Sequence, residues 1–119
     1  PAGDVQVVPQ VYAPPPKPAV CNYTVGGQWW GGGWAVVRIN NTSSTTIHGW
    51  QASWTYADDS TVGTVYNAVL TGTAPSYTVN DAGWNADIAP GATSEVYLYF
   101  SQGTQDPLPA PVVSGTICQ

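Results

Sequence analysis

The chain has 119 residues, a length that suits one domain. With 2 basic and 7 acidic side chains its net charge is -5, and only 8% of its residues are charged, whereas a typical globular protein has about 25%. Nucleic acids and anionic membrane surfaces are bound by clusters of basic side chains, but this chain has only Lys17 and Arg38. No apolar run approaches the roughly 20 residues that span a bilayer. We therefore expect a soluble domain that binds neither nucleic acid nor membrane.

Residues 1–20 differ in composition from the rest of the chain. They contain six prolines, including the run PPPKP at residues 14–18, and no tryptophan. Proline fixes φ and removes a backbone hydrogen-bond donor, so this stretch is unsuited to a helix or a central strand. We predict a flexible Pro-rich tail or linker over residues 1–20 and a β-sandwich domain over residues 21–119.

From residue 21 onward the sequence has the composition of strands. Valine outnumbers leucine fifteen to three in the chain, and threonine, tyrosine and tryptophan are abundant. Alternation of apolar and polar residues predicts strands at residues 34–40, 49–56 and 95–100, with weaker candidates at residues 22–25, 61–66, 68–70, 76–80 and 112–117. Clusters of turn-forming residues separate these segments. Short, regularly spaced strands without a helical period predict an all-β fold, an antiparallel β-sandwich.

The same alternation assigns aromatic residues to one or the other face of a strand. Trp50 and Trp54 lie on the apolar side of their strand, so we expect them in the core. Trp34, Tyr97 and Tyr99 lie on the side opposite the apolar residues of their strands. These three rings are therefore expected on the outer surface.

Two cysteines, Cys21 and Cys118, bracket nearly the whole predicted domain. A disulfide between them would close a loop of about 100 residues, for which the chain-entropy model gives about 4 to 5 kcal/mol of stabilisation. Disulfides indicate an extracytoplasmic compartment, so we expect a secreted protein. Two free thiols are the alternative, whereas metal ligation is disfavoured because one histidine and two distant cysteines do not supply four ligands.

Residues suited to catalysis are few. His48 is the single histidine, and no serine or cysteine nucleophile motif accompanies it. A glycosidase needs two carboxyl groups flanking the scissile bond. The candidate acids are Asp58, Asp59, Asp81, Asp87 and Glu95, and no loop has the alternating oxygen ligands of an EF-hand-type calcium site. We predict no enzymatic activity, no metal and no cofactor, with a small glycosidase kept as an alternative.

Aromatic residues in turn-like sequence are the most informative feature. Trp29 and Trp30 lie in the glycine-rich segment GGQWWGGG at residues 26–33, and Trp84 follows NDAG at residues 80–83. Large apolar rings on loops usually mark a contact surface. Flat aromatic rings suit pyranose rings, whose faces are rows of C–H groups, while the hydroxyls at the sugar edge bind polar side chains. The sequence thus predicts a binding site for a neutral polysaccharide.

Several motifs occur together in an ordered series. They are the terminal cysteine pair, Gln28-Trp29, the stretch NTSSTTIHGW at residues 41–50, AGWN at residues 82–85, IAPG at residues 88–91 and SGTIC at residues 114–118. In the order and spacing of these motifs, residues 21–118 resemble a family 2 carbohydrate-binding module. Such modules are the cellulose-binding domains that Pro- and Thr-rich linkers join to secreted bacterial cellulases and xylanases.

This resemblance implies a nine-stranded antiparallel sandwich, jelly-roll or immunoglobulin-like, closed by the terminal disulfide and carrying three aromatic platforms on one flat face. The platforms fall on Trp29, Tyr66 and Trp84, where the family usually has tryptophan at the second position. Trp50 falls on the family's interior tryptophan. Candidate flanking contacts to the polysaccharide are Trp34, Tyr97, Tyr99, Glu95 and Gln28.

The predicted binding face also departs from the family pattern. Polar residues that flank the platforms in cellulose binders are replaced here by Gly27, Val36, Glu95 and Tyr99, so much of the amide hydrogen bonding is absent. We expect a monomeric, secreted, non-catalytic module that binds insoluble β-1,4-linked polysaccharide, cellulose before others. Chitin binding and a secreted protein-interaction domain derived from such a module are the alternatives.

Overall fold

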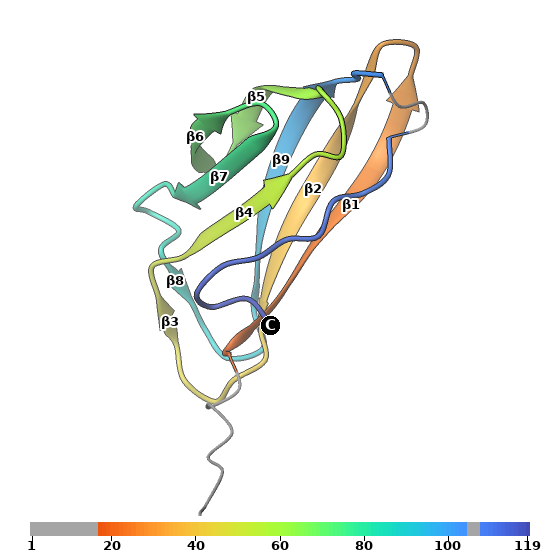
Figure 1. Ribbon diagram of the computed structural model, residues 1–119. Coiled ribbons are helices and arrows are strands. Elements are labelled where there is room, and N and C mark those ends of the chain that lie inside the picture. The colour runs from red at the N-terminus through yellow and green to blue at the C-terminus, as the bar shows by residue number, and fades with distance from the viewer. Residues whose placement is uncertain (1–16, 105–107) are drawn as a thin grey trace, which may run out of the picture.

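The computed structural model describes residues 17–104 and 108–119 (Figure 1). Within these ranges it contains nine strands and no helix. The strands are β1 (Ala19–Trp29), β2 (Gly32–Asn41), β3 (Ile47–His48), β4 (Gln51–Thr55), β5 (Thr61–Tyr66), β6 (Ala68–Thr73), β7 (Ser76–Asp81), β8 (Asp87–Ile88) and β9 (Thr93–Ser101). Most of the predicted tail lies outside the described residues, and β1 starts within the last two residues assigned to that tail.

The strands form two main sheets that pack face to face. One sheet has the order β1-β2-β9-β5, the other has the order β4-β7-β6, and β3 pairs with β8. Every strand pair is antiparallel. Figure 1 shows β4 and β7 lying across β2 and β9, so the two sheets are the layers of a sandwich. The predicted all-β antiparallel sandwich is confirmed.

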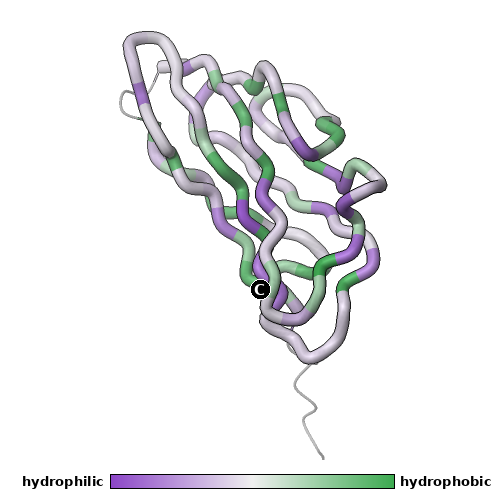
Figure 2. The backbone as a smooth tube through the Cα atoms, turned by 180° about the vertical axis from the view of Figure 1, so that it is seen from behind, coloured by the Kyte–Doolittle hydropathy of each residue, from purple (hydrophilic) through white to green (hydrophobic). Residues whose placement is uncertain are grey.

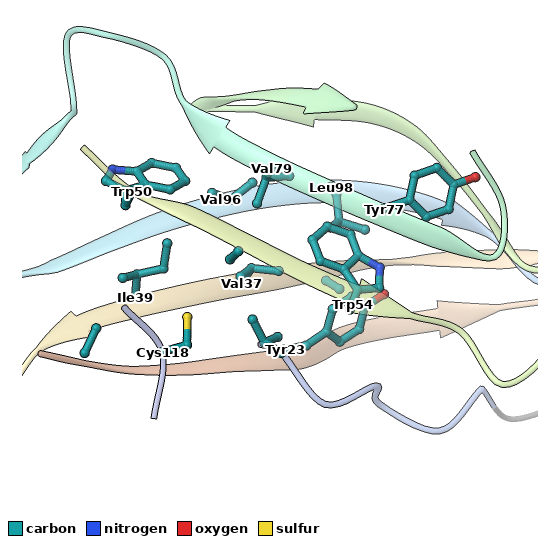
Figure 3. Packing of buried hydrophobic residues seen from close by; sticks show 14 of the residues in the cluster. Tyr23, Val37, Ile39, Trp50, Trp54, Tyr77, Val79, Val96, Leu98 and Cys118 are labelled. Carbon is teal, nitrogen blue, oxygen red and sulfur yellow. The ribbon is translucent and has the colours of Figure 1, made fainter. Parts of the chain in front are cut away.

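The hydrophobic core lies between the two sheets (Figure 3). Trp50 and Trp54 point into it, with only 4% and 2% of their surfaces exposed, as the alternation predicts. The ring of Trp54 lies 5.8 Å from that of Tyr23 and 6.3 Å from that of Tyr77, measured between centroids. Figure 2 shows apolar and polar residues alternating along the strands. One face of each sheet packs against the core, and the side chains on its other face point outward.

The glycine-rich segment does not form the loop that its composition predicts. Strands β1 and β2 run through it, and the turn is confined to residues 30–31, where Gly31 has a positive φ of 86°. Trp34 of β2 lies over Gly26 and Gly27: a Cβ atom on Gly26 would collide with the six-membered ring of its indole. These two glycines make room for a neighbouring side chain and do not reverse the chain.

The C-terminal segment also differs from the prediction. Residues 112–117 form no strand, and Ser114 takes part only in an isolated bridge to Ser53. Ser53 and Ser114 exchange two backbone hydrogen bonds of 2.8 Å each, which attach the segment to β4. Cys21 and Cys118 are disulfide-bonded with their Cα atoms 5.4 Å apart, so the predicted disulfide is confirmed.

Tyr23 and Tyr56 form a buried pair whose hydroxyl oxygens are 3.1 Å apart. Their exposed fractions are 5% and 3%, and burial raises the pKa of both phenols above the ordinary value of 10.0. The folded protein therefore keeps both groups protonated at pH values at which the unfolded chain loses the protons. The stability that the folded protein gains from these two protonated hydroxyls is fully present below pH 10.0 and is lost as the pH rises above it.

We expect the free energy of unfolding to fall above about pH 10 with a slope of about 1.4 kcal/mol per pH unit for each of the two tyrosines. Urea unfolding at a series of alkaline pH values measures this slope. In the variant Tyr23→Phe/Tyr56→Phe the slope should be shallower, since the two groups no longer titrate. An equally steep decline in that variant would assign the alkaline effect to other groups.

Candidate functional site

The outer face of the four-stranded sheet carries a group of exposed aromatic side chains. In the ladder, Trp34 of β2 lies opposite Tyr99 of β9, and Tyr97 of β9 lies opposite Tyr66 of β5. Leu98, between the two β9 tyrosines, is buried in the core. Because side chains alternate between the two faces of a strand, the four rings point away from the core. Trp34, Tyr97 and Tyr99 thus face outward, as the sequence predicts.

Trp29, at the end of β1, adds a fifth ring to this surface. The ring centroids of Trp29 and Tyr99 are 6.4 Å apart, those of Tyr66 and Tyr99 are 6.4 Å apart, and those of Trp34 and Tyr97 are 6.5 Å apart. The exposed fractions of the five side chains range from 38% to 52%. We call these five residues the aromatic face: Trp29, Trp34, Tyr66, Tyr97 and Tyr99. The face includes a shallow depression of about 250 Å³ lined by four of the rings.

The rings of the aromatic face differ in tilt. Tyr99 stands edge-on to Tyr66, with 76° between their planes, and is inclined by 49° to Trp29. Trp34 and Tyr97 are inclined by 34°, the smallest angle among these contacts. Tyr99 therefore supports the two rings beside it, and an edge-to-face contact of this kind is one that aromatic pairs favour.

Trp84 lies in the turn after β7 and is 76% exposed. The neighbouring Asn85 fixes this turn: its Oδ1 accepts a hydrogen bond of 2.8 Å from the backbone N–H of Ala82, and its Nδ2 donates one of 2.7 Å to the carbonyl of Asn67. The indole Nε1 of Trp50 donates a hydrogen bond of 2.8 Å to the carbonyl of Asn85. The turn that carries Trp84 is thus attached to the core through Trp50 and to Asn67, the residue that follows β5.

We expect Asn85→Ala to lower the free energy of unfolding by about 2 kcal/mol, because two side-chain hydrogen bonds are lost at about 1 kcal/mol each. The matched variant Asn85→Asp keeps the acceptor for Ala82 but loses the donor to Asn67, so about half the effect is expected. Urea denaturation measures both. Unchanged stability in the two variants would show that the turn is held without this side chain.

A second pocket connects Trp84 to the aromatic face. It has a volume of about 290 Å³, and its lining includes Trp84, Tyr97, Glu95 and Asn67. Asn67 has a positive φ of 69°, and its Nδ2 donates a hydrogen bond of 3.1 Å to the carbonyl of Glu95. The three predicted platforms, together with Tyr97, therefore lie on one connected side of the molecule.

Glu95 lies on the same side of β9 as Tyr97 and forms an ion pair with Arg38 of β2. The distance between Nε of Arg38 and Oε2 of Glu95 is 2.9 Å, and the side chains are 42% and 39% exposed. An ion pair this exposed contributes only about 0 to 1 kcal/mol to stability. The two opposite charges cancel, so this pair adds no net charge beside the aromatic face.

The structure places Gln28 differently from the other predicted contacts. Its Nε2 donates to the carbonyl of Leu108 at 3.4 Å, and its Oε1 accepts from the backbone N–H of Leu108 at 3.3 Å. The amide group is thus engaged within the protein, where it holds the C-terminal segment against β1. Trp30 was not predicted to belong to the site. It lies in the turn next to Trp29 and is 96% exposed.

Sequence reasoning missed the residues that position the rings. Asn85 belongs to the AGWN motif, and Gly26 and Gly27 belong to the glycine-rich segment, but neither pattern indicated that these residues hold Trp84 and Trp34 in position. The only signal for the glycines was their number next to two tryptophans. No group of three His, Cys, Asp or Glu side chains within the described residues could hold a metal ion, and no helix there could cross a membrane.

The fold and the aromatic face define a small β-sandwich binding domain. A family model described as "Cellulose binding domain" matches residues 19–118. Endoglucanase B from Cellvibrio japonicus (strain Ueda107) is 40% identical over 100 residues, which are 84% of this chain and 19% of that relative. Endoglucanase C from the same strain is 36% identical over 100 residues, or 84% of this chain and 13% of the relative. The chain belongs to this cellulose-binding domain family, family 2 of the non-catalytic carbohydrate-binding modules, and spans less than a fifth of these two relatives.

Solved structures show the same fold. The cellulose-binding family 2 carbohydrate-binding domain from ScLPMO10C has a TM-score of 0.63 and 23% identity, covering 82% of this chain and 95% of that one. The chitin-binding domain of Chi18aC from Streptomyces coelicolor has a TM-score of 0.65 and 22% identity, covering 86% of this chain and 95% of that one. These domains share a backbone arrangement with the present chain.

Proposed function

We propose that this domain binds insoluble β-1,4-linked polysaccharide, cellulose first, through the aromatic face and Trp84. The observation that supports this most is the set of contiguous exposed tryptophan and tyrosine rings on one side of the sandwich. Such rings stack on the C–H faces of pyranose rings, while their polar atoms remain available to hydroxyl groups. The ion pair of Arg38 and Glu95 leaves this surface suited to a neutral ligand.

The energetics support binding of modest strength. A ring that covers about 100 Å² of ligand contributes about 2.5 kcal/mol at about 25 cal/mol per Å². Three platforms, Trp29, Tyr66 and Trp84, give about 7 kcal/mol before the cost of association, which leaves a useful affinity. We assign flanking contacts to Trp34, Tyr97, Tyr99 and Glu95. Gln28 has its role in holding the segment at Leu108 in place.

The proposal extends to where the domain works. The disulfide between Cys21 and Cys118 supports an oxidising compartment, and hence secretion. Residues 1–18, which precede β1, would serve as the linker to another domain, which the module would hold against insoluble polymer. The relatives named endoglucanases, of which this chain matches less than a fifth, support such an arrangement.

Depletion binding to microcrystalline cellulose tests the function, with chitin, insoluble xylan and cross-linked dextran measured in parallel. We expect saturable retention on cellulose and none on the α-linked dextran, which lacks flat extended chains. Preferential retention on chitin would change the assigned polymer. If the domain is retained on none of the β-1,4-linked polymers, the polysaccharide site is rejected and a protein partner is favoured.

A further inference from the structure

The three predicted platforms belong to two different layers of the sandwich. Trp29 and Tyr66 are the last residues of β1 and β5, which lie in the four-stranded sheet. Trp84 follows β7, a strand of the three-stranded sheet. A polymer that stacks on all three rings therefore bridges both layers. Its affinity depends on how firmly the turn that carries Trp84 is held relative to the aromatic face.

Asn67 is the residue at which the chain passes from one layer to the other. It separates β5, at the edge of the four-stranded sheet, from β6, at the edge of the three-stranded sheet. Its φ of 69° lies in the left-handed region, which residues other than glycine seldom adopt. Asparagine and aspartate are the side chains that tolerate this region best. The backbone at this corner therefore suits glycine, asparagine or aspartate.

Two hydrogen bonds of Asn67 lead in opposite directions. Its carbonyl accepts a bond of 2.7 Å from Nδ2 of Asn85, the residue next to Trp84. Its own Nδ2 donates a bond of 3.1 Å to the carbonyl of Glu95 in β9. The same strand carries two rings of the aromatic face. The two bonds thus form a continuous connection from the turn of Trp84 to the four-stranded sheet.

Other hydrogen bonds of this turn attach it to the three-stranded sheet. The backbone N–H of Gly83 donates to Oδ1 of Asp81, the last residue of β7, at 3.0 Å. The indole of Trp50, which directly precedes β4, donates to the carbonyl of Asn85 at 2.8 Å. These bonds hold the turn beside β4 and β7, whereas the connection through Asn67 holds it beside β9.

The connection lies in the gap between Trp84 and the aromatic face. Asn67, Asn85 and Glu95 line the same pocket of about 290 Å³ as Trp84 and Tyr97. The side chain of Asn67 is partly buried there. The two hydrogen bonds therefore span the gap that separates the two rings.

We propose that Asn67 is a positioning residue of the binding surface, whose side-chain amide fixes Trp84 relative to the aromatic face. This inference rests on the proposed function. A platform that is in place before the polymer arrives is not ordered on binding, so the cost of ordering it is not subtracted from the affinity. Glycine at position 67 would keep the backbone conformation and the bond to Asn85 but would lose the bond to Glu95.

Two variants test the role of the amide. Asn67→Gly and Asn67→Asp both remove the Nδ2 donor and keep a residue that tolerates a positive φ. Because they differ in size and in backbone freedom, an effect that both share comes from the lost hydrogen bond. We expect the affinity of each for microcrystalline cellulose to fall about fivefold, as for one platform that must be ordered on binding.

Asn80→Asp is the matched control, the same chemical change in the other sheet. Oδ1 of Asn80 accepts a hydrogen bond of 3.1 Å from Nε2 of Gln51, and aspartate keeps this acceptor. Its affinity for cellulose should equal that of the unchanged domain. Thermal unfolding of each variant checks that it is folded at the temperature of the binding assay.

A double-mutant cycle separates positioning of Trp84 from a general effect on the fold. If Asn67 acts through Trp84, Asn67→Gly should change the affinity by less than about twofold when Trp84→Ala is already present. The motion of the indole gives a direct readout. Nitrogen-15 relaxation of the indole N–H of Trp84, identified by its absence in Trp84→Ala, should show greater mobility in Asn67→Gly. An indole as rigid as in the unchanged domain would contradict the inference.

Three further results would overturn it. Unchanged affinity in both Asn67 variants would show that the bond to Glu95 does not contribute to the presentation of Trp84. A loss in Asn67→Gly alone would assign the effect to backbone freedom. Equal losses with and without Trp84 would mean that Asn67 acts on the polymer itself or through another ring. Failure of the unchanged domain to bind any of the β-1,4-linked polymers is a different outcome, because it rejects the proposed function.

Discussion

Replacing Trp29 and Trp84 together with alanine is expected to lower the affinity for microcrystalline cellulose by about a hundredfold or more. A hundredfold loss corresponds to about 2.7 kcal/mol, and two platforms contribute about 5 kcal/mol before association costs. Trp29 is supported by Tyr99 and Trp84 by the turn that Asn85 fixes, so each ring is presented in a defined position. Removing them takes away both ends of the proposed binding surface.

The neighbouring Trp30 provides the matched control. It has the same chemistry as Trp29 and is more exposed, at 96%, but it lies in the β1-β2 turn. We expect Trp30→Ala to change the affinity by less than about threefold, which is less than about 0.7 kcal/mol. Equal losses for Trp29→Ala and Trp30→Ala would indicate that any exposed tryptophan drives adsorption. Retention of nearly full affinity by the Trp29→Ala/Trp84→Ala variant would place the site elsewhere.

These substitutions leave the core intact, so a loss of binding can be separated from a loss of folding. Trp29 and Trp84 are 52% and 76% exposed, whereas Trp50 and Trp54 are 4% and 2% exposed. Because Trp29 is half covered and its ring contacts that of Tyr99, the free energy of unfolding should fall by about 1 kcal/mol in the double variant, less than the roughly 3 to 5 kcal/mol typical when one buried tryptophan is replaced by alanine. Urea denaturation measured beside the binding isotherm checks this.

The outward position of Trp34, Tyr97 and Tyr99 could be predicted from the sequence because a strand alternates with a period of two. Once Val96 and Leu98 are assigned to the core, the tyrosines between and beyond them must lie on the opposite face. The same reasoning predicted the core positions of Trp50 and Trp54. Such predictions need only the local periodicity of one strand, so they do not depend on knowing how the sheets pack.

Features that depend on contacts between distant segments could not be predicted in the same way. The glycine-rich segment was predicted as a loop, but most of it belongs to β1 and β2, and two of its glycines, Gly26 and Gly27, leave space for the ring of Trp34. Gln28 contacts Leu108, which is 80 positions away in the sequence. Composition alone cannot distinguish a glycine that turns the chain from one that accommodates a ring.

The disulfide is expected to make the largest single contribution to the stability of the domain. It joins residues 97 positions apart, and closing a loop of about 100 residues restricts the unfolded chain by about 4 to 5 kcal/mol in the chain-entropy model. The whole free energy of unfolding of a domain is about 5 to 15 kcal/mol. We therefore expect Cys21→Ala/Cys118→Ala to lower it by about 4 kcal/mol and the melting temperature by about 15 to 25 °C.

Backbone hydrogen bonds also attach the C-terminus, and the experiment must separate them from the disulfide. The N–H of Ala19 donates to the carbonyl of Ile117, and the N–H of Gln119 donates to the carbonyl of Ala19, both at 2.9 Å. These bonds exist in the folded state only, whereas the cross-link acts on the unfolded chain. Reductant should thus destabilise the unchanged domain as much as Cys21→Ala/Cys118→Ala does and leave that variant unaffected. A change below about 1 kcal/mol in the free energy of unfolding would show that the hydrogen bonds alone hold the C-terminus in place.

Cellulose binding by the folded variant should persist, because β2, β9 and β5 carry most of the aromatic face.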